Sequence, residues 1–333
     1  MTGHELDEVT PEVVELRETC RRLERRLARA TARTSDLVDA VYQAARDAAV
    51  IVGPAVIKPA AKDRRRAAGE VCLIHATDWQ AGKRTPSYDL NVLEDRAGRF
   101  VDKVRGLTAI QRADHPVRSC VVMLGGDMVE GVDIFPGQAW ELETTLYEQL
   151  FTTARILEGF LASLAGDFER VTVVTEWGNH GRLGRRGDFP GGDNIDRMLY
   201  RVVQDRLPAL EWQHSDQFYN RVVVGEYRAL LAHGDEIKSF GGNVPAFGIL
   251  RKCNAWASGA LPFTFQDVYL GHFHTPMTLT LANGGRVFVT GSPESDNAYA
   301  MEFCAATGIP SQRVHYVDPE RGRVAAEYTV WLD

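Results

Sequence analysis

The chain has 333 residues, of which 44% are hydrophobic and 25% are charged, and its formal net charge is −7. This composition excludes a disordered chain and provides apolar material for one large domain or two ordinary ones. The negative charge means that any nucleic-acid binding has to rely on a local basic patch.

Membrane and disulfide-rich classes are also excluded. No apolar run approaches the roughly 18 residues that a membrane span needs. The first residues, MTGHELDEV, are acidic and polar and predict no secretory signal. The scattered, odd-numbered cysteines show no CxxC pair, so we expect buried free thiols and a cytoplasmic protein. These cysteines are Cys20, Cys72, Cys120, Cys253 and Cys304.

The first segment has the pattern of a coiled-coil helix. Its apolar residues are spaced alternately by three and four: Val13, Leu16, Cys20, Leu23, Leu27 and Ala30. Arginines fill the intervening positions, which favours a solvated helix face, with a nucleic-acid or partner surface as the alternative. We predict a helical segment over 1–51 that serves a homodimer or a partner protein. A linker over 52–69, rich in Pro, Gly, Ala and charge, then leads to the main domain, 70–333.

From residue 70 onward, short β-rich runs alternate with longer helical patterns, which predicts a layered α/β core. The expected strands are Val71–Thr77, Cys120–Leu124, Val171–Thr175, Ala229–Ala232 and Val268–Leu270. The expected helices are Asn91–Gln111, Trp140–Leu164, Asn194–Gln204 and Val244–Ala257. A hairpin is expected to turn at Gly225-Glu226. Four runs in the tail are predicted to be β-structure: Met277–Leu281, Arg286–Thr290, Arg313–Val317 and Arg323–Trp331.

Each of the five β-rich runs leads into a small polar cluster. The clusters are Thr77-Asp78-Trp79-Gln80, Gly125-Gly126-Asp127, Gly178-Asn179-His180-Gly181, Ala232-His233-Gly234-Asp235 and Gly271-His272-Phe273-His274. One such cluster alone is more often a turn or a structural histidine. Ligand sites in open α/β sheets lie outside the carboxyl ends of the strands, so five neighbouring strands would bring these side chains to one point.

This set of motifs resembles the calcineurin-like metallophosphoesterase superfamily, whose signature is DxH…GD…GNH…HG…GHxH. The resemblance covers about residues 70–295. It implies a four-layer αββα sandwich, here with an added N-terminal helix. A softer similarity to Mre11/SbcD-like and phage-encoded phosphoesterases rests on the stretch Gly126–Gly131, the GNHGR loop and the tail Gly291-Ser292-Pro293.

The resemblance also implies a dinuclear metal centre. By position, Asp78, Gln80 and His274 match ligands of the first metal, and Asp127 matches the carboxylate that bridges both metals. Asn179, His233 and His272 match ligands of the second metal, and His180 matches the histidine that contacts the scissile phosphate. The implied cofactors are two divalent ions, with manganese expected and magnesium, iron(II) or zinc as alternatives. A hydroxide bridging the two ions would attack phosphorus.

Two positions depart from the family's pattern. Gln80 stands where a histidine is usual, and an amide oxygen should shift the preference toward hard cations. Gly181 follows the GNH motif where many members carry an acid that orients the histidine, so Asp235 or another carboxylate would have to substitute. Trp79 is interpreted as core packing, and Glu130, Asp133 and Gln138 as ordinary loop residues.

The predicted function is hydrolysis of phosphodiesters, and we expect a DNA nuclease. Two divalent ions and two aspartates together leave a surplus of positive charge. This charge balances a hydroxide and a singly charged diester better than a hydroxide and a doubly charged monoester. Arg182, Arg185 and Arg186 are candidate contacts to a nucleic-acid backbone, or else a solvated basic loop paired to Asp188 and Asp193. The alternatives are a phosphatase or small-nucleotide phosphodiesterase, and a binding scaffold with a degenerate site.

Overall fold

The computed structural model describes residues 53–135, 137–184, 186, 189–190, 192–238, 245–297 and 308–333, together with 18–22, 25, 36, 39–44 and 46–47. The chain divides into two compact units, 1–48 and 49–333. In the first unit the described residues are helical, including 18–22. Most of the predicted coiled-coil seam lies outside the described residues, and the coiled coil stays a prediction.

The first sheet of the second unit has six strands in the order β11-β10-β1-β2-β3-β4. Strands β1 to β4 pair in parallel. Strands β10 and β11 add an antiparallel edge beside β1. Their bounds are β1 Glu70–Ala76, β2 Val117–Leu124, β3 Arg170–Thr175, β4 Glu211–Gln213, β10 Ser311–Asp318 and β11 Arg323–Trp331. The parallel strands all end at the same edge, which places their following loops together.

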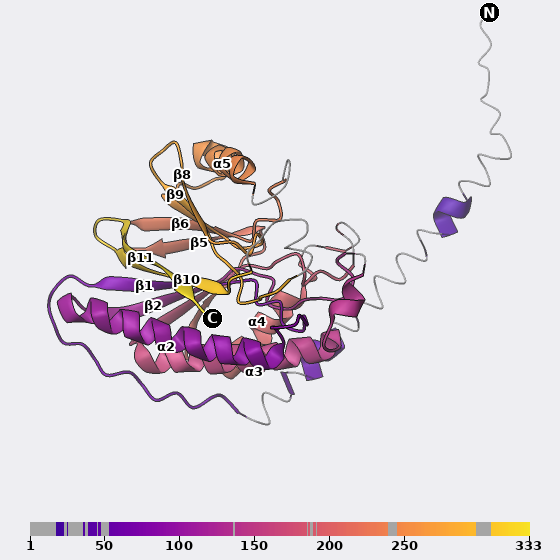
Figure 1. The fold of residues 1–333 in the computed structure, drawn as a ribbon, viewed down its shortest axis with the longest axis horizontal. Helices are drawn as coiled ribbons and strands as arrows, with labels where there is room; N and C mark the ends of the chain where they lie inside the picture. Colours follow the sequence, from indigo (N-terminus) through magenta and orange to yellow (C-terminus); the bar gives the residue numbers. More distant parts are fainter. Residues whose placement is uncertain are drawn as a thin grey trace, which may run out of the picture. The chain divides into compact units, whose positions relative to one another are not determined.

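Helices cover the outer face of this sheet (Figure 1). They are α2 Leu90–Asp114, α3 Leu146–Asp167 and α4 Ile195–Arg206. The first two pack through stacked Phe100 and Phe160, whose ring centroids are 5.8 Å apart. Trp79 is buried against Phe160, so its prediction as a core residue is confirmed.

The second sheet has five strands in the order β5-β6-β7-β9-β8. Their bounds are β5 Tyr219–Val224, β6 Tyr227–Ala232, β7 Asp267–Leu270, β8 Met277–Thr280 and β9 Arg286–Val289. The predicted hairpin is confirmed, because β5 and β6 pair antiparallel around Gly225-Glu226. Helix α5, Ala246–Ala255, and the turn Trp256–Ala260 cover the outer face of this sheet through Ile249, Cys253 and Trp256.

The two sheets pack face to face and complete the expected four-layer sandwich. Alternate residues of β1 and β2, such as Leu73 and Met123, join Tyr269 and Phe288 of the second sheet in one buried cluster. Side chains on the other face of β1, such as Ile74, are also fully buried, so both faces of this strand are covered. This fold class confirms the sequence prediction.

Several local predictions were wrong. The helix expected over Trp140–Leu164 is broken: a 3₁₀ turn, Gln138–Glu141, precedes α3, which begins only after Thr145. The reason is a helix cap, because the Thr145 hydroxyl accepts a hydrogen bond from the backbone N–H of Glu148. Strand β4 was missed because it has only three residues.

The prediction of buried free thiols is confirmed for Cys72, Cys120 and Cys253. It was wrong for Cys20, which is exposed, and Cys304 lies outside the described residues.

The predicted linker, 52–69, belongs to the second unit over its described part. Its residues lie along the helical layer without regular secondary structure (Figure 1). Hydrogen bonds fix it at two points: the Ala55 N–H donates to the carbonyl of Arg206 (2.9 Å), and the Asp63 N–H donates to Glu169 (2.7 Å). In the part of the chain that is described, no helix is long and apolar enough to cross a membrane. The predicted domain boundaries stay predictions.

Candidate metal centre

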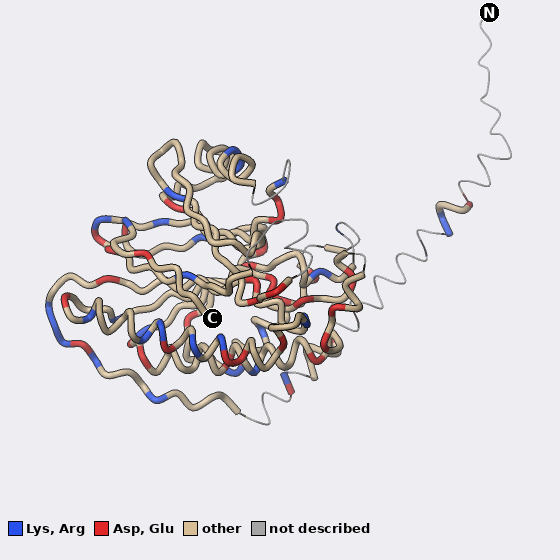
Figure 2. The backbone as a smooth tube through the Cα atoms, viewed as in Figure 1, with Lys and Arg blue, Asp and Glu red and all other residues tan. Residues whose placement is uncertain are grey.

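The five polar clusters meet at one edge of the sandwich, where the loops of both sheets lie together. The strands that lead into them are divided between the sheets: β1, β2 and β3 belong to the first sheet and β6 and β7 to the second. Hydrogen bonds cross between the sheets: the His272 N–H donates to the Asp78 carboxylate (2.9 Å), and His233 Nδ1 lies 2.8 Å from the carbonyl oxygen of Gly125. Acidic residues gather in these loops (Figure 2).

The backbone at this edge is unusual. Six described residues other than glycine have a positive φ, and five of them are predicted ligands: Asp78 (54°), Gln80 (47°), Asp127 (50°), His272 (67°) and His274 (52°). The left-handed conformation is unfavourable for L-residues, and such residues concentrate at functional sites. At each of these positions, the loop turns sharply just past the end of a strand and directs the side chain to the shared edge.

Three side chains form the second predicted metal site. Ligand atoms of Asp127, His233 and His272 all lie within 4.8 Å of one another. His233 Nε2 is 3.0 Å from Asp127 Oδ2 and 3.2 Å from Asn179 Oδ1, so the predicted fourth ligand is also in place. Carboxylate, imidazole and amide oxygen are ligands that zinc, manganese or iron accept.

The first predicted metal site lies beside it. His274 Nε2 is 3.4 Å from Asp78 Oδ1 and 3.2 Å from Gln80 Nε2, and the latter is 3.4 Å from Asp127 Oδ2. Gln80 Oε1 is buried without a hydrogen-bond partner among the described residues. A half-turn of the amide would bring this oxygen to face Asp127 and His274, where a cation would satisfy it. The donor set therefore fits a divalent ion at each site.

Two neighbouring histidines stabilise the negative charge of Asp127. Burial would raise the pKa of Asp127, but the charges of His233 and His180 hold it far below its usual range. Burial would likewise lower the pKa of His233, yet Asp127 raises it well above 6.5. Metal ligation requires neutral imidazole, so a cation bound between Asp127 and His233 would take the place of the His233 proton.

His180 is held by Glu130, so the prediction of Glu130 as an ordinary loop residue was wrong. The imidazole Nδ1 lies 2.7 Å from the backbone carbonyl of Glu130 and 3.4 Å from its Oε2. Burial would lower the pKa of His180, but the charges of Asp127 and Glu130 raise it to about 9. Its Nε2 lies 4.0 Å from Asp127 Oδ2, at the edge of the predicted metal cluster.

Glu130 also supplies the carboxylate that Gly181, the residue after the GNH motif, does not provide. A Cβ at position 181 would collide with the side chain of Asn194, which caps α4, so no acidic residue fits there. The carboxylate beside His180 therefore comes from the loop after β2. Asp235, the other candidate, pairs instead with Arg186 at 3.8 Å.

A buried lysine connects both sides of the centre. Lys83 Nζ lies 3.9 Å from Glu130 Oε1 and 3.7 Å from Glu294 Oε2. The far oxygen of Glu294 is 3.7 Å from Nδ1 of His274. We call Lys83, Glu130 and Glu294 the lysine bridge, because it links the carboxylate behind His180 to the carboxylate behind His274.

The residues of the lysine bridge stabilise one another's charged forms. Burial would raise the pKa of Glu294, but His274 and Lys83 lower it to about 2. Burial would lower the pKa of Lys83, yet the charges of Glu294 and Glu130 raise it. Gln138 adds a hydrogen bond to Glu130 at 2.9 Å, so this residue is also no ordinary loop residue; Asp133 is exposed.

Asp196 fixes the loop that carries Asp127. From the first turn of α4, its carboxylate accepts hydrogen bonds from the backbone N–H groups of Asp127 (2.9 Å), Met128 (3.1 Å) and Gly178 (2.9 Å). It is fully buried, and burial together with the charge of Asp127 raises its pKa to about 6. In the sequence, an Asp in a first helical turn is ordinary, so nothing there singled it out.

The predicted substrate arginines differ in their contacts. Arg182 Nε donates to the backbone carbonyl of the predicted ligand Asn179 (2.9 Å), which ties its guanidinium to the loop after β3. Arg186 lies farther out, paired with Asp235 and not with Asp193. Arg185 lies outside the described residues.

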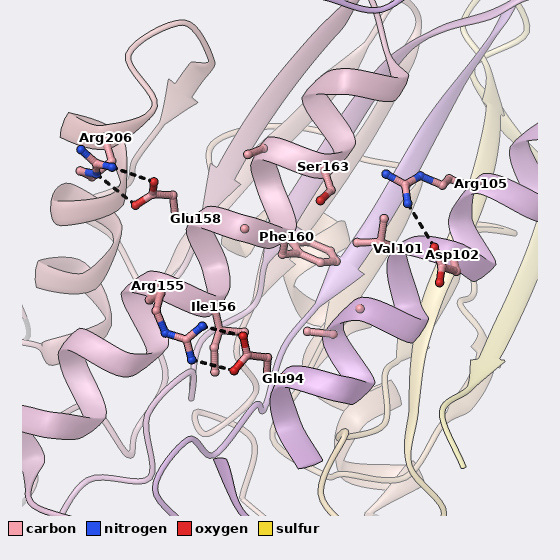
Figure 3. Close-up of a pocket in the computed structure, with 14 residues that line it drawn as sticks. Glu94, Val101, Asp102, Arg105, Arg155, Ile156, Glu158, Phe160, Ser163 and Arg206 are labelled. Carbon is pink, nitrogen blue, oxygen red and sulfur yellow. Dashed lines mark hydrogen bonds and ion pairs between the residues drawn. The ribbon is translucent and has the colours of Figure 1, made fainter. Parts of the chain in front are cut away.

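A cavity lies away from the predicted metal centre. It measures about 670 Å³ and is formed by α2, α3 and Arg206 of α4. Ion pairs between Arg155 and Glu94 (2.5 Å) and between Arg206 and Glu158 (3.0 Å) lie along it (Figure 3). None of the predicted ligands lines it, so size alone does not mark the functional site.

Replacing Gln80 with histidine tests the first metal site. We expect Gln80→His to tighten Zn²⁺ binding by about tenfold, because imidazole is a better zinc ligand than an amide oxygen. Competition against a chromophoric chelator measures this. Gln149→His, which changes a buried glutamine outside the ligand cluster, is the control. Unchanged affinity in Gln80→His would mean that residue 80 is not a ligand.

Comparisons with known proteins give only remote likenesses. No protein-family model matches the sequence, and no curated protein matches it. Among solved structures, the chain is similar to zinc-complexed Vps29 from Entamoeba histolytica, with 12% identity, 79% of this chain and 99% of that chain covered, and a TM-score of 0.34.

Two further solved structures have comparable similarity. One is a predicted phosphoesterase from Streptococcus pneumoniae (13% identity, 79% and 99% covered, TM-score 0.31). The other is purple acid phosphatase PPD1 from yellow lupin (11% identity, 80% and 54% covered, TM-score 0.35). Scores and identities this low carry no argument about function, which rests on the site itself.

Proposed function

We propose that this chain is a metal-dependent hydrolase of phosphoric esters, that it acts on phosphodiesters, and that DNA is its substrate. One observation carries the proposal: seven predicted ligands from five loops meet at one edge, with His180 and Arg182 beside them. Five of those ligands have left-handed backbone, a conformation that packing alone does not favour.

The residues divide into two ligand sets that share Asp127. Asp78, Gln80 and His274 would hold one ion, and Asn179, His233 and His272 the other. Two divalent ions bound there would supply Lewis acidity toward the phosphoryl oxygens and a nucleophilic water at neutral pH. Manganese is our expectation for both positions.

His180 would act as the proton donor. With Nδ1 bound by Glu130, the Nε2–H is the atom free to face a leaving oxygen at the cluster. Proton donation by a positioned imidazole contributes about 10²–10⁴-fold to such reactions. Arg182 would contact a non-bridging phosphoryl oxygen through its terminal nitrogens.

The experiment uses metal-stripped protein with end-labelled single- and double-stranded DNA, in manganese, magnesium or chelator. Methyl p-nitrophenyl phosphate serves as a simple diester and p-nitrophenyl phosphate as a monoester. We expect metal-dependent cleavage of DNA and of the diester. His180→Ala should lower it by about 10²–10⁴-fold.

The control is His115→Ala, because His115 pairs with Glu70 at the opposite end of β1 from the ligands. Hydrolysis of the monoester alone would replace the diesterase proposal with the phosphatase alternative. No hydrolysis with any metal would contradict an enzymatic role and favour the scaffold alternative.

A further inference from the structure

A second cavity adjoins the predicted metal centre. It measures about 310 Å³ and lies between the loop after β3, Phe218, the loop after β6 and six described residues that follow the β3 loop: Arg182, Leu183, Arg186, Phe189, Pro190 and Asp193. It shares Asn179 with the second metal site and includes Asp235, two residues after His233. A group bound in this cavity would therefore lie directly beside a phosphate held at the metals.

Aromatic side chains form much of its lining. They are Trp177, Phe189 and Phe218, joined by Leu183 and Pro190. Two of the rings pack against other side chains. The guanidinium of Arg197 lies 4.9 Å from the centroid of the Trp177 ring, and Phe218 packs on Tyr219 and Trp256 with centroids 5.0 and 5.7 Å apart. Rings that are already ordered lose little entropy when a flat ligand stacks on them.

The polar groups of the cavity suit a nucleotide. Arg182 lies on the side of Asn179, and its two terminal nitrogens have no hydrogen-bond partner among the described residues. Glu236 lines the cavity too, and its Oε2 is buried with no hydrogen-bond partner in the described chain. A cation beside the metals fits a phosphate, and a carboxyl group among aromatic rings fits the amino edge of a base.

We propose that this cavity binds the base and sugar of one unpaired nucleotide whose phosphate lies at the metals. The inference rests on the proposed function and adds the form of its substrate. The volume is at the low end of the range for small-molecule sites, about 300–1,000 Å³, which suits one nucleoside and excludes a duplex. A paired base would have to leave its stack to enter, so single strands and frayed ends are the preferred substrates.

The test compares two single strands that differ only in their bases. A fluorescently labelled oligodeoxycytidylate and the same backbone with abasic sites carry equal phosphate charge. Both strands carry phosphorothioate linkages, which slow hydrolysis, and binding is measured by anisotropy in manganese. We expect the wild-type chain to bind the intact strand about tenfold more tightly, a ratio that corresponds to about 1.4 kcal/mol of stacking.

Phe189→Ala should abolish most of that ratio, because it removes one stacking surface. Arg182→Gln should weaken the binding of both strands by a similar factor and leave the ratio intact. Phe247→Ala is the matched control, since Phe247 is 82% exposed on α5 and does not line the cavity. Melting temperatures of all variants establish that each one folds.

Equal binding of the intact and abasic strands by the wild-type chain would overturn the proposal, and so would a loss of the ratio in Phe247→Ala that matches the loss in Phe189→Ala. Hydrolysis of methyl p-nitrophenyl phosphate is assayed separately. If that hydrolysis is present and the ratio is absent, the cavity proposal fails while the proposed function stands. If the ratio is present without hydrolysis, the proposed function fails.

Discussion

Lys83→Met is expected to lower the free energy of unfolding by about 3–5 kcal/mol, because it leaves two buried carboxylates without their shared counter-charge. Glu130 is fully buried and Glu294 nearly so, and Lys83 lies between them. Methionine fills a similar volume, so the loss reports the charge and not a cavity. Urea titration of the wild-type and variant proteins measures it.

The matched control is Lys103→Met, which removes an exposed lysine of α2. Its effect should stay within about 0.5 kcal/mol. Lys83→Arg keeps the charge and should lose less than Lys83→Met. If Lys83→Met were no more destabilising than Lys103→Met, the lysine bridge would contribute nothing to the fold.

Asp127→Asn is expected to abolish metal binding at the shared position and to lower kcat/KM for a diester by about 10³-fold or more. The predicted bridging carboxylate contacts His233, and the backbone N–H of His180 donates to its other oxygen (2.6 Å). Asparagine keeps that hydrogen bond and tolerates the left-handed backbone, but it lacks the charge that holds a cation. Several kcal/mol of transition-state stabilisation corresponds to a factor of this size.

Metal stoichiometry by elemental analysis and hydrolysis of methyl p-nitrophenyl phosphate measure the two effects. Asp133→Asn is the control, because Asp133 is an exposed carboxylate six residues farther along the same loop. Unchanged stoichiometry in Asp127→Asn would contradict the assignment of Asp127 as the shared ligand.

The sequence predicted the strands and the polar clusters because both are local patterns. A β-rich run that stops at Gly-Asp or Gly-His is visible in a few residues, and chain topology then brings the clusters together. The broken helix before α3 escaped prediction because a single cap at Thr145 overrides a favourable helical periodicity.

The supporting residues could not be predicted in the same way. Lys83 and Glu294 are 211 positions apart in the sequence, and neither lies in a recognisable motif. Asp196 resembles any acidic residue at a helix start, although it fixes the backbone around Asp127. Glu130 lies about 50 positions before His180 in the sequence, and only the distance in the fold shows that its carboxylate contacts the imidazole. Such roles depend on burial and distance, which a single sequence does not display.

The left-handed backbone of the five ligands bears on how this surface could change over generations. Glycine would adopt the same φ angles without strain, so backbone conformation alone would favour glycine at Asp78, Gln80, Asp127, His272 and His274. At Asp127 that exchange would also remove the acceptor of the His180 N–H. Each of the five side chains is therefore kept at a cost in backbone strain, which is the pattern expected if selection acts on this edge for the cation binding that we propose.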